Sequence, residues 1–366
     1  MNRTMICVCG TVLLAAATSV RAQSSVTLYG LVDILVDISQ QGYGRLVRET
    51  NGGISGSRWG LDGKEDLGSG YKAIFKLEDG FAPNNGTIQQ GGALFGRQAW
   101  LGISTPSYGA LTFGRQYTPE FLALSQNDAF NAGLGGAFFN FDRTAPNGTV
   151  AAILESQIIT VRTNNSVVYT SPTYVGISGA AMYAFGGVPG SLATGSTKSF
   201  GLNYQSASLG LHAGYTRLNE SVGSGAFVEW GVGGTYTVGP VKGFLGYTKN
   251  TYSDTTVANA STAPTLRYAV ANLGVVYQIL SPLAVTAQVS RIIDTSDGLP
   301  ASQNAFVEAV SLQYQISKRT SCYLGYSQVN NKNGSAYSLG GALYFGGQAR
   351  PDRTARTVQV GLRTIF

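Results

Sequence analysis

The sequence has little of what catalytic, metal-binding and disulfide-stabilised proteins need. Its 366 residues contain one histidine and three cysteines, and two of these, Cys7 and Cys9, lie in an N-terminal stretch that we expect to be removed. The remaining Cys322 cannot build a disulfide framework. One histidine and one cysteine disfavour a zinc site, and no glycine-rich segment lies between a strand and a helix as phosphate binding requires. We therefore expect no cofactor and no metal.

Charge and long hydrophobic runs are also scarce. Charged residues make up 12% of the chain, whereas a soluble domain has about a quarter. Beyond the N-terminal stretch no apolar run approaches eighteen residues, which excludes a membrane helix. The net charge of +6 falls to +4 without Arg3 and Arg21, which gives no sign of a nucleic-acid partner. Mean hydropathy near zero (+0.05) is expected when one face of each strand meets lipid and the other meets water.

The N-terminus has the order of a secretory signal. Met1-Asn2-Arg3 is positive, an apolar run follows from about Met5 to Ala17, and Val20-Arg21-Ala22 offers a cleavage site. We place cleavage after Ala22, so residues 1–22 form a signal peptide and residues 23–366 the mature domain. A retained amphipathic anchor is the alternative.

Strand-like alternation begins at once in the mature chain. From Val26 to Asp37 one parity is apolar, and the other carries Thr27, Tyr29, Asp33 and Asp37. Period two with both carboxylates on one face indicates a strand with one apolar and one wet side. We therefore predict that Asp33 and Asp37 face a water-filled interior. The polar stretch 38–55 is predicted to be the first long connection.

The same alternation recurs along the chain, with short and long connections in turn. After residues 57–65, 71–78 and the two segments around Arg97, strands are predicted at about 165–172, 174–186, 198–206, 209–220, 226–238, 241–252, 266–279, 282–293, 305–316, 319–329 and 356–366. Tight turns join the pairs, and longer polar stretches separate them. This alternation is typical of an all-β transmembrane antiparallel barrel of about 16 strands.

An even strand count lets the first and last strands pair and removes the open edge. Residues 337–345 could be a further strand or a hairpin within the last loop. A soluble β-sandwich or propeller would also alternate, but strands of about ten residues with a continuous apolar face argue against it.

A stretch of about forty residues after Tyr117 breaks the pattern. Connections between packed elements are usually a handful of residues, and longer ones are often functional. We predict that the 118–164 segment, the third loop, folds into the barrel and narrows it.

Several motifs together resemble the trimeric general porins of Gram-negative bacteria, in their betaproteobacterial branch. These are Ser25-Val-Thr-Leu-Tyr-Gly-Leu-Val-Asp33, residues 57–70, Phe95-Gly-Arg-Gln-Ala-Trp-Leu-Gly102, Gly114-Arg-Gln-Tyr117, residues 165–172, residues 317–320 and the terminal Phe366. The resemblance covers the mature chain, although residues 118–164 match poorly. It implies a homotrimeric outer-membrane channel for passive passage of small hydrophilic solutes and ions, surrounded by lipid and lipopolysaccharide. Phe366 resembles the signal read by the barrel-assembly machinery.

Selectivity in a pore depends on its width and on the charges at its narrowest part. By the resemblance, Arg58, Arg97 and Arg162 are assigned to a basic wall of the constriction. Parity supports Arg58, which opposes Trp59, and strict alternation also puts Arg97 opposite Trp100. An arginine in the lumen or at the rim that never meets permeant ions is the alternative for each.

The remaining assignments follow from the same resemblance. Second-rank candidates for pore lining are Lys72, Lys76 and Arg115, and candidates for acidic groups on the third loop are Glu120, Asp128 and Asp142. Each could equally form a local salt bridge, turn or cap. The excess of basic residues predicts a mild preference for anions.

Two other functions are alternatives to a general channel. Some outer-membrane barrels are enzymes, and an acyl-transfer triad generally needs a histidine base held by a carboxylate. The one histidine, His212, has neither Ser nor Asp beside it in the sequence, so a lumen-lining role is favoured. A substrate-selective channel or surface receptor on the same barrel stays open. Its aromatic track could use Phe138, Phe139 and Phe141, although these residues could instead anchor the loop to the wall.

Overall fold

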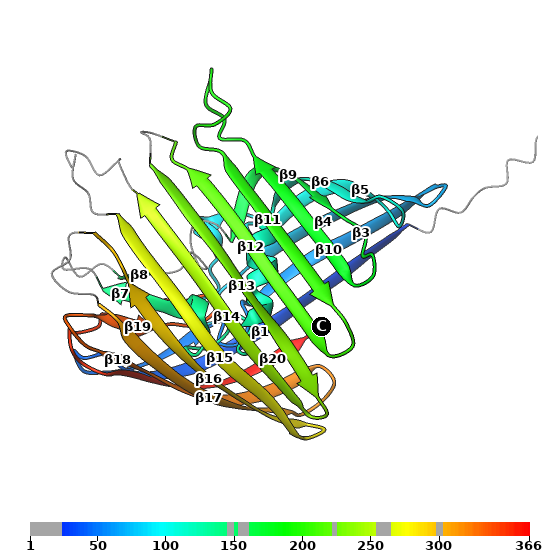
Figure 1. Ribbon diagram of the computed structural model, residues 1–366. Coiled ribbons are helices and arrows are strands. Elements are labelled where there is room, and N and C mark those ends of the chain that lie inside the picture. Colours follow the sequence, from blue (N-terminus) through cyan, green and yellow to red (C-terminus); the bar gives the residue numbers. More distant parts are fainter. Residues whose placement is uncertain (1–23, 145–149, 153–160, 222–224, 254–264, 298–302) are drawn as a thin grey trace, which may run out of the picture.

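One closed antiparallel sheet surrounds an interior occupied by two loops (Figure 1). The computed structural model describes residues 24–144, 150–152, 161–221, 225–253, 265–297 and 303–366; the expected signal peptide, residues 1–22, lies outside them. The first strand, β1 (Ser25–Gln40), pairs with the last, β20 (Ala355–Ile365), in a register that runs from Leu31 opposite Ile365 to Gln40 opposite Arg356. This pairing closes the barrel, so the sheet has no open edge at that seam.

The other wall strands follow in chain order. They are β2 (Arg45–Asn51), β3 (Arg58–Gly68), β4 (Tyr71–Gly80), β5 (Gln98–Thr105), β6 (Gly109–Tyr117), β9 (Arg162–Thr170), β10 (Ile177–Ala184), β11 (Thr197–Gln205), β12 (Leu209–Asn219), β13 (Ala226–Val238), β14 (Val241–Ser253), β15 (Leu266–Leu280), β16 (Leu283–Asp294), β17 (Ala305–Gln315) and β18 (Thr320–Asn331). A short 3-10 turn, η1 (Gln90–Gly92), lies in the connection from β4 to β5.

The prediction that 38–55 is one long connection was wrong. β1 continues to Gln40, and β2 pairs with its second half, from Ile34 opposite Asn51 to Gln40 opposite Arg45. β3 pairs with the first half of β1. Because β2 and β3 follow one another along the same neighbour, they form one interrupted strand, and the barrel has the sixteen positions expected. Residues 45–51 escape notice in the sequence because Arg45, Arg48 and Glu49 mask the alternation.

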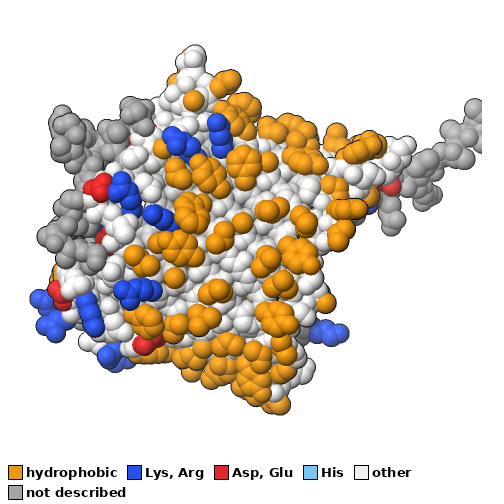
Figure 2. Space-filling view, in the orientation of Figure 1, with side chains coloured by type: hydrophobic (Ala, Val, Ile, Leu, Met, Phe, Trp, Pro, Cys, Tyr) orange, Lys and Arg blue, Asp and Glu red, His pale blue; other side chains and the backbone are white. Residues whose placement is uncertain are grey.

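Alternation separates an apolar outside from a polar inside. Leu211, Tyr215 and Arg217 share the outer parity of β12, whereas His212 and Thr216 lie on the inner one and are buried. Figure 2 shows hydrophobic side chains spread over the outer strand surface, with Lys and Arg gathered toward the long-loop end. An apolar exterior on a closed sheet is the arrangement that a bilayer requires. Among the described residues, no helix is long and apolar enough to cross a membrane.

The segment after β6 lies against the inner wall. It contains α1 (Pro119–Leu124), η2 (Ser125–Asn127), η3 (Phe138–Asn140), β7 (Phe141–Thr144) and β8 (Val150–Ala152). Thr118 caps α1, since its hydroxyl accepts a hydrogen bond from the Phe121 amide at 3.4 Å, and Pro119 occupies the first turn.

Side chains from several strands of the wall hold this segment. Asn272 on β15 donates to the Asn127 carbonyl at 2.9 Å, and Gln359 on β20 accepts from the Gly135 amide at 2.9 Å. Inner-face glycines make room for it. A Cβ on Gly214 would lie 2.9 Å from Glu120, and one on Gly231 would lie 2.8 Å from Leu124.

The last long connection also turns inward. β19 (Tyr337–Leu339) pairs antiparallel with β7, from Tyr337 opposite Arg143 to Leu339 opposite Phe141, and β8 completes a three-stranded sheet. Of the two possibilities left open for residues 337–345, the structure therefore contains a strand inside the loop. A bridge between Gly341 and Tyr344 continues the turn.

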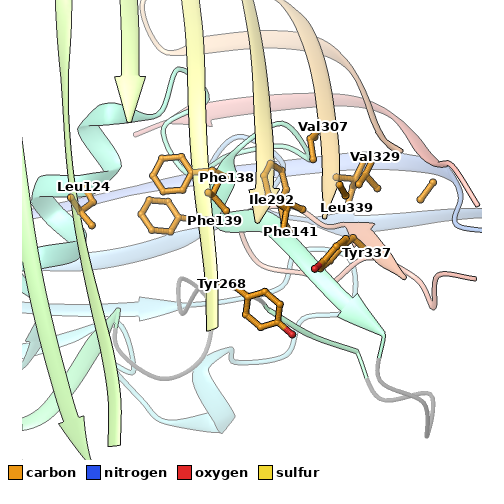
Figure 3. Close-up of a cluster of buried hydrophobic side chains, with 13 residues drawn as sticks. Leu124, Phe138, Phe139, Phe141, Tyr268, Ile292, Val307, Val329, Tyr337 and Leu339 are labelled. Carbon is orange, nitrogen blue, oxygen red and sulfur yellow. The ribbon is translucent and has the colours of Figure 1, made fainter. Parts of the chain in front are cut away.

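An aromatic cluster fastens the two inward segments to the wall. Phe138, Phe139 and Phe141 are at most 1% exposed, and Figure 3 shows them between Leu124 and Leu339, with the rings of Phe138 and Phe139 next to each other. The cluster also includes the inner-face residues Tyr268, Val270, Ile292, Val307 and Val329. These phenylalanines therefore anchor the loop and do not form an aromatic track in the open lumen.

Candidate functional site

Three arginines predicted from the sequence lie together on one side of the barrel interior. Arg97, which immediately precedes β5, pairs with Glu78 on β4, with 2.8 Å between Nε and Oε1. Arg58, the first residue of β3, lies 3.8 Å from the other carboxylate oxygen of Glu78. The hydroxyl of Tyr29 donates to that oxygen at 2.9 Å. One carboxylate thus faces two guanidinium groups, which leaves the cluster with a surplus of positive charge.

Tyr117 joins the third arginine to the cluster. Its hydroxyl accepts hydrogen bonds from Arg97 at 2.6 Å and from Arg162 at 2.5 Å. The Arg162 guanidinium carbon also lies 4.3 Å from the centroid of the Tyr117 ring, a cation–π contact. The Tyr117 ring also stacks on Phe121 of α1, with ring centroids 5.6 Å apart. The inward segment is thereby attached to the basic wall.

A cavity of about 540 Å³ lies beside this cluster. Its lining includes four arginines, Arg58, Arg97, Arg162 and Arg363, and among the described lining residues Glu78 is the one acidic side chain. The inward segments contribute neutral residues, namely Phe121, Leu122, Ser125, Asn131, Ala132, Asn140, Ala342 and Leu343. The charge of this space is therefore set by arginine.

The acidic candidates of the third loop are placed elsewhere. Asp128 accepts from the amides of Phe130 at 3.2 Å and Ala132 at 2.9 Å, and from the side chain of Gln288 at 2.9 Å. Asp142 accepts from the Gly346 amide at 2.7 Å. These carboxylates fasten the loop, and the structure does not bring them to the cavity lining.

The third candidate, Glu120, is also away from the cavity. It is 1% exposed and lies against β11 and β12, where its amide donates to the hydroxyl of Ser199 at 3.1 Å. The opposition of a basic wall and an acidic loop expected from the resemblance is therefore not formed by these residues. In the described part of the loop, neutral side chains face the arginines.

Burial shifts the titration of the two fastening carboxyls. Removal from water raises the pKa of Asp128 to about 6, although hydrogen bonds from Ala132, Gln288 and Phe130 oppose the change. Burial likewise raises the pKa of Asp142 to about 7, against the Gly346 amide and the nearby charge of Arg48. Both groups favour protonation more strongly in the folded protein than an ordinary aspartate does.

The second-rank candidates do not line the cavity. Lys76 pairs with Asp62 at 3.2 Å, and Lys72 lies near the turn between β3 and β4. Arg115 has the outer parity of Phe113, and its Nε donates to the Gly96 carbonyl at 2.6 Å. The register between β6 and β9 shifts between Gly114 and Gln116, with one extra residue on β9. Beyond this irregularity Tyr117 lines the cavity, whereas Arg115 does not.

The two aspartates predicted on the inner face of β1 lie there and are fully buried. Asp33 accepts from the amides of Ile54 at 3.0 Å and Ser55 at 2.8 Å, which fixes the interruption between β2 and β3. Asp37 pairs with Arg48 at 3.0 Å. Asp33 thus binds backbone amides at the wall, and Asp37 binds the guanidinium group of Arg48 there.

Three residues that line the cavity are not among the site candidates predicted from the sequence: Glu78, Tyr117 and Arg363. Parity places Glu78 and Arg363 on wet faces. However, the contact of Glu78 with Arg97 depends on a register that only the folded sheet gives. Tyr117 belongs to one of the motifs quoted above, but its role arises from two arginines 20 and 45 residues away.

His212 also lies on the inner face, as its parity predicts. Its Nδ1 shares a hydrogen bond with the side chain of Asn203 at 3.0 Å. Within the described residues, no group of three or more His, Cys, Asp or Glu side chains is arranged to hold a metal ion.

Comparison with known proteins identifies the architecture. The model of the Gram-negative porin family matches residues 10–334. The chain belongs to this family. Its wall, its apolar exterior and its arginine-lined interior are thus those of an outer-membrane porin, a channel for passive diffusion of small solutes.

Relatives support the assignment along the whole chain. The porin is 31% identical over 283 residues to an outer membrane porin protein of Bordetella pertussis, covering 69% of this chain and 70% of the relative. It is 28% identical over 364 residues to outer membrane porin protein 32 of Delftia acidovorans, covering 97% of each. Among solved structures, the anion-selective porin from Comamonas acidovorans has a TM-score of 0.77 at 24% identity, covering 94% of this chain and 100% of that one.

Proposed function

We propose that this porin is a general diffusion channel with a mild preference for anions, set by the arginines of its cavity. The observation that carries the proposal is the charge of the described lining: Arg58, Arg97, Arg162 and Arg363 against Glu78. Guanidinium groups stay protonated even beside one another, so the surplus persists across the working pH range. A permeating anion is stabilised here and a cation is repelled.

The position of the loop carboxylates strengthens the proposal. Asp128 and Asp142 are 1% exposed and hydrogen-bonded, and Glu120 is 1% exposed against the wall. A carboxylate that does not line the cavity offsets little of the potential within it. The structurally similar porin from Comamonas acidovorans is described as anion-selective, which agrees with this assignment.

The proposal extends to assembly. We infer a homotrimer in the outer membrane, in contact with lipid and lipopolysaccharide, exported by a cleaved signal over residues 1–22. A solved Vibrio cholerae relative of the fold is described in a trimer form. In this proposal the terminal Phe366 is read by the barrel-assembly machinery.

The test is conductance of the refolded porin in a planar bilayer, with the zero-current potential measured across a KCl gradient. We expect large ohmic steps in groups of three and a potential that favours chloride. A folded barrel that conducts no ions would contradict the diffusion function. Conduction with a potential favouring potassium would contradict the anion preference alone.

A further inference from the structure

The cavity has two chemically different sides. The arginines lie on the wall, whereas the inward segments present uncharged side chains to the same space. Ser125, Asn131 and Asn140 are polar, and the large apolar ones are Phe121, Leu122 and Leu343. A channel for hydrophilic solutes does not need apolar side chains at its lining, whereas apolar side chains beside a few well-placed polar or charged groups are typical of ligand-binding sites. These apolar side chains therefore indicate that the cavity also contacts apolar parts of a solute.

Leu122 shows that this side is open to solutes. The other face of α1 is packed against the wall, where Pro119, Glu120, Ala123 and Leu124 are buried. Leu122 is 51% exposed, and its helix lies inside the barrel. This side chain is thus neither lipid-facing nor part of the aromatic cluster, and it remains available for contact.

Leu343 brings a second apolar group close to the arginines. It packs over Gly56, where an added Cβ would lie 2.6 Å from its Cδ1 and 3.0 Å from the Nη1 of Arg97. Phe121 is similarly placed, because it stacks on Tyr117, whose hydroxyl binds Arg97 and Arg162. Apolar surface and guanidinium groups thus adjoin each other at two points of the cavity.

The arginines differ in their exposure and in how many hydrogen bonds they already make. Arg97 is 3% exposed and already bonds both Glu78 and Tyr117. Arg58 is more open, with 26% of its side chain exposed and a separation of 3.8 Å from Glu78. Arg58 can therefore donate to a passing carboxylate without losing a close partner, and the charge of Arg162 adds to the attraction.

We propose that this constriction preferentially binds monocarboxylates that carry an apolar chain or ring. The carboxylate meets Arg58 in the cavity that Arg162 also lines, and the apolar part lies on Leu122, Phe121 and Leu343. Chloride uses only the first of these interactions, and a hydroxylated acid loses water from its hydroxyl groups at the apolar side. The inference rests on the proposed anion preference and adds to it a class of preferred solute.

The test measures how acetate, butyrate and hexanoate inhibit the chloride current of the refolded porin at constant ionic strength. Each methylene that is about half buried strengthens binding roughly twofold, so we expect hexanoate to inhibit at about one-sixteenth of the acetate concentration. Free diffusion alone gives no such gain with chain length.

Variants separate the two halves of the site. Leu122→Asn and Leu343→Asn should each reduce the dependence on chain length, because they remove apolar contact. Arg58→Gln should weaken inhibition by all three acids by a similar factor. Leu192→Asn is the matched control, since Leu192 is 75% exposed in the connection from β10 to β11 and does not line the cavity.

The outcomes distinguish this inference from the proposed function. If chloride is preferred but acetate and hexanoate inhibit equally, the solute class is wrong and the anion preference stands. A dependence on chain length that survives in both Leu122→Asn and Leu343→Asn would likewise overturn the apolar site. If potassium is preferred in the wild type, the proposed anion preference itself has failed.

Discussion

At the scale of single residues, the charge balance of the cavity depends on Glu78. This carboxylate pairs with Arg97 at 2.8 Å and lies 3.8 Å from Arg58, so it offsets part of the arginine charge. The four lining arginines exceed it by three positive charges among the described lining residues. Neutralising Glu78 should therefore raise the preference for anions rather than abolish it.

We expect Glu78→Gln to increase the ratio of chloride to potassium permeability roughly twofold to threefold. A unit charge about 7 Å from a permeating ion contributes about 0.6 kcal/mol in water, and screening at about 0.1 M salt roughly halves this. The remaining effect has opposite signs for chloride and potassium, so their permeability ratio changes by about 0.6 kcal/mol in all. The zero-current potential in a KCl gradient measures the change. Asp297→Asn is the control. Asp297 lies in the connection after β16, pairs with Arg267 and does not line the cavity. An unchanged potential in Glu78→Gln would exclude Glu78 from the conducting path.

The buried carboxyls Asp128 and Asp142 should make the folded loop sensitive to pH. Their folded pKa values of about 6 and about 7 exceed the ordinary value of 3.8. Between these values the folded state keeps protons that the unfolded state releases. The free energy of unfolding is therefore highest below about pH 4 and falls as the pH rises toward 7. We expect the apparent melting temperature in detergent to fall over that range.

Asp142→Asn tests this origin. The amide oxygen can still accept from the Gly346 amide but cannot ionise, so the variant should lose the part of the pH dependence that lies nearest the folded pKa of about 7. The contribution of Asp128 should remain at lower pH. Equal melting profiles for wild type and variant from about pH 4 to 8 would show that Asp142 does not titrate in this way.

At the scale of elements, the last connection acts as a second inward loop. β19 pairs with β7, and Ala342 and Leu343 reach the cavity. The strands that it joins are already adjacent, with Val329 opposite Ala355. A short linker can therefore replace residues 334–352 without breaking the wall.

We expect this replacement to raise single-channel conductance, because it removes lining residues from the cavity. It should also lower thermal stability, since Tyr337 and Leu339 leave the aromatic cluster. Shortening the connection between Ala184 and Thr197 is the control, as these residues are also paired and that loop does not line the cavity. Conductance that stays at the wild-type value would place the narrowest part of the channel away from this loop.

The wall strands are predicted well from the sequence, and the inward loops are not. Alternation predicts β13 with the bounds observed, and most other wall strands fall within two or three residues of their predicted bounds. It misses β2, because Arg48 and Glu49 occupy adjacent positions and hide the period. The inward loops follow no period, and their positions depend on contacts such as that of Asp128 with Gln288, 160 residues away.

The candidate site can be foreseen in part for the same reason. Parity and motif assign Arg58 and Arg97 to the interior, because wall residues alternate. Nothing in the local sequence distinguishes a carboxylate that faces the lumen from one that fastens a loop. Asp142 accepts a hydrogen bond from the backbone amide of Gly346, which lies 204 residues further along the chain. Its role can therefore be recognised only in the folded structure.

At the scale of the whole molecule, the two ends of the barrel domain meet and close it. The Phe366 amide donates to the Gly30 carbonyl at 2.9 Å, and the Gly30 amide donates to the Phe366 carbonyl at 3.0 Å. The ring covers Gly30, where a Cβ would lie 2.4 Å from it. The backbone bonds do not need the aromatic side chain, so its packing over Gly30 can be separated from its proposed role in assembly.

We expect Phe366→Ala to refold in detergent with a small loss of stability but to reach the outer membrane of cells in much lower amount. The measurement compares heat-modifiable barrel in refolded samples and in isolated outer membranes. Equal losses in both would assign Phe366 to packing over Gly30 alone, and normal levels in cells would contradict the proposed role in assembly.

The most direct test of the central claim, that arginines of the cavity set the ion preference, is the zero-current potential of Arg58→Gln, Arg162→Gln and their combination in a KCl gradient. Arg217→Gln is the matched control, because Arg217 lies on the outer face of β12. We expect each cavity substitution to lower the chloride preference roughly twofold to threefold and the control to leave it unchanged. A double variant with the wild-type potential would show that these arginines do not set the ion preference.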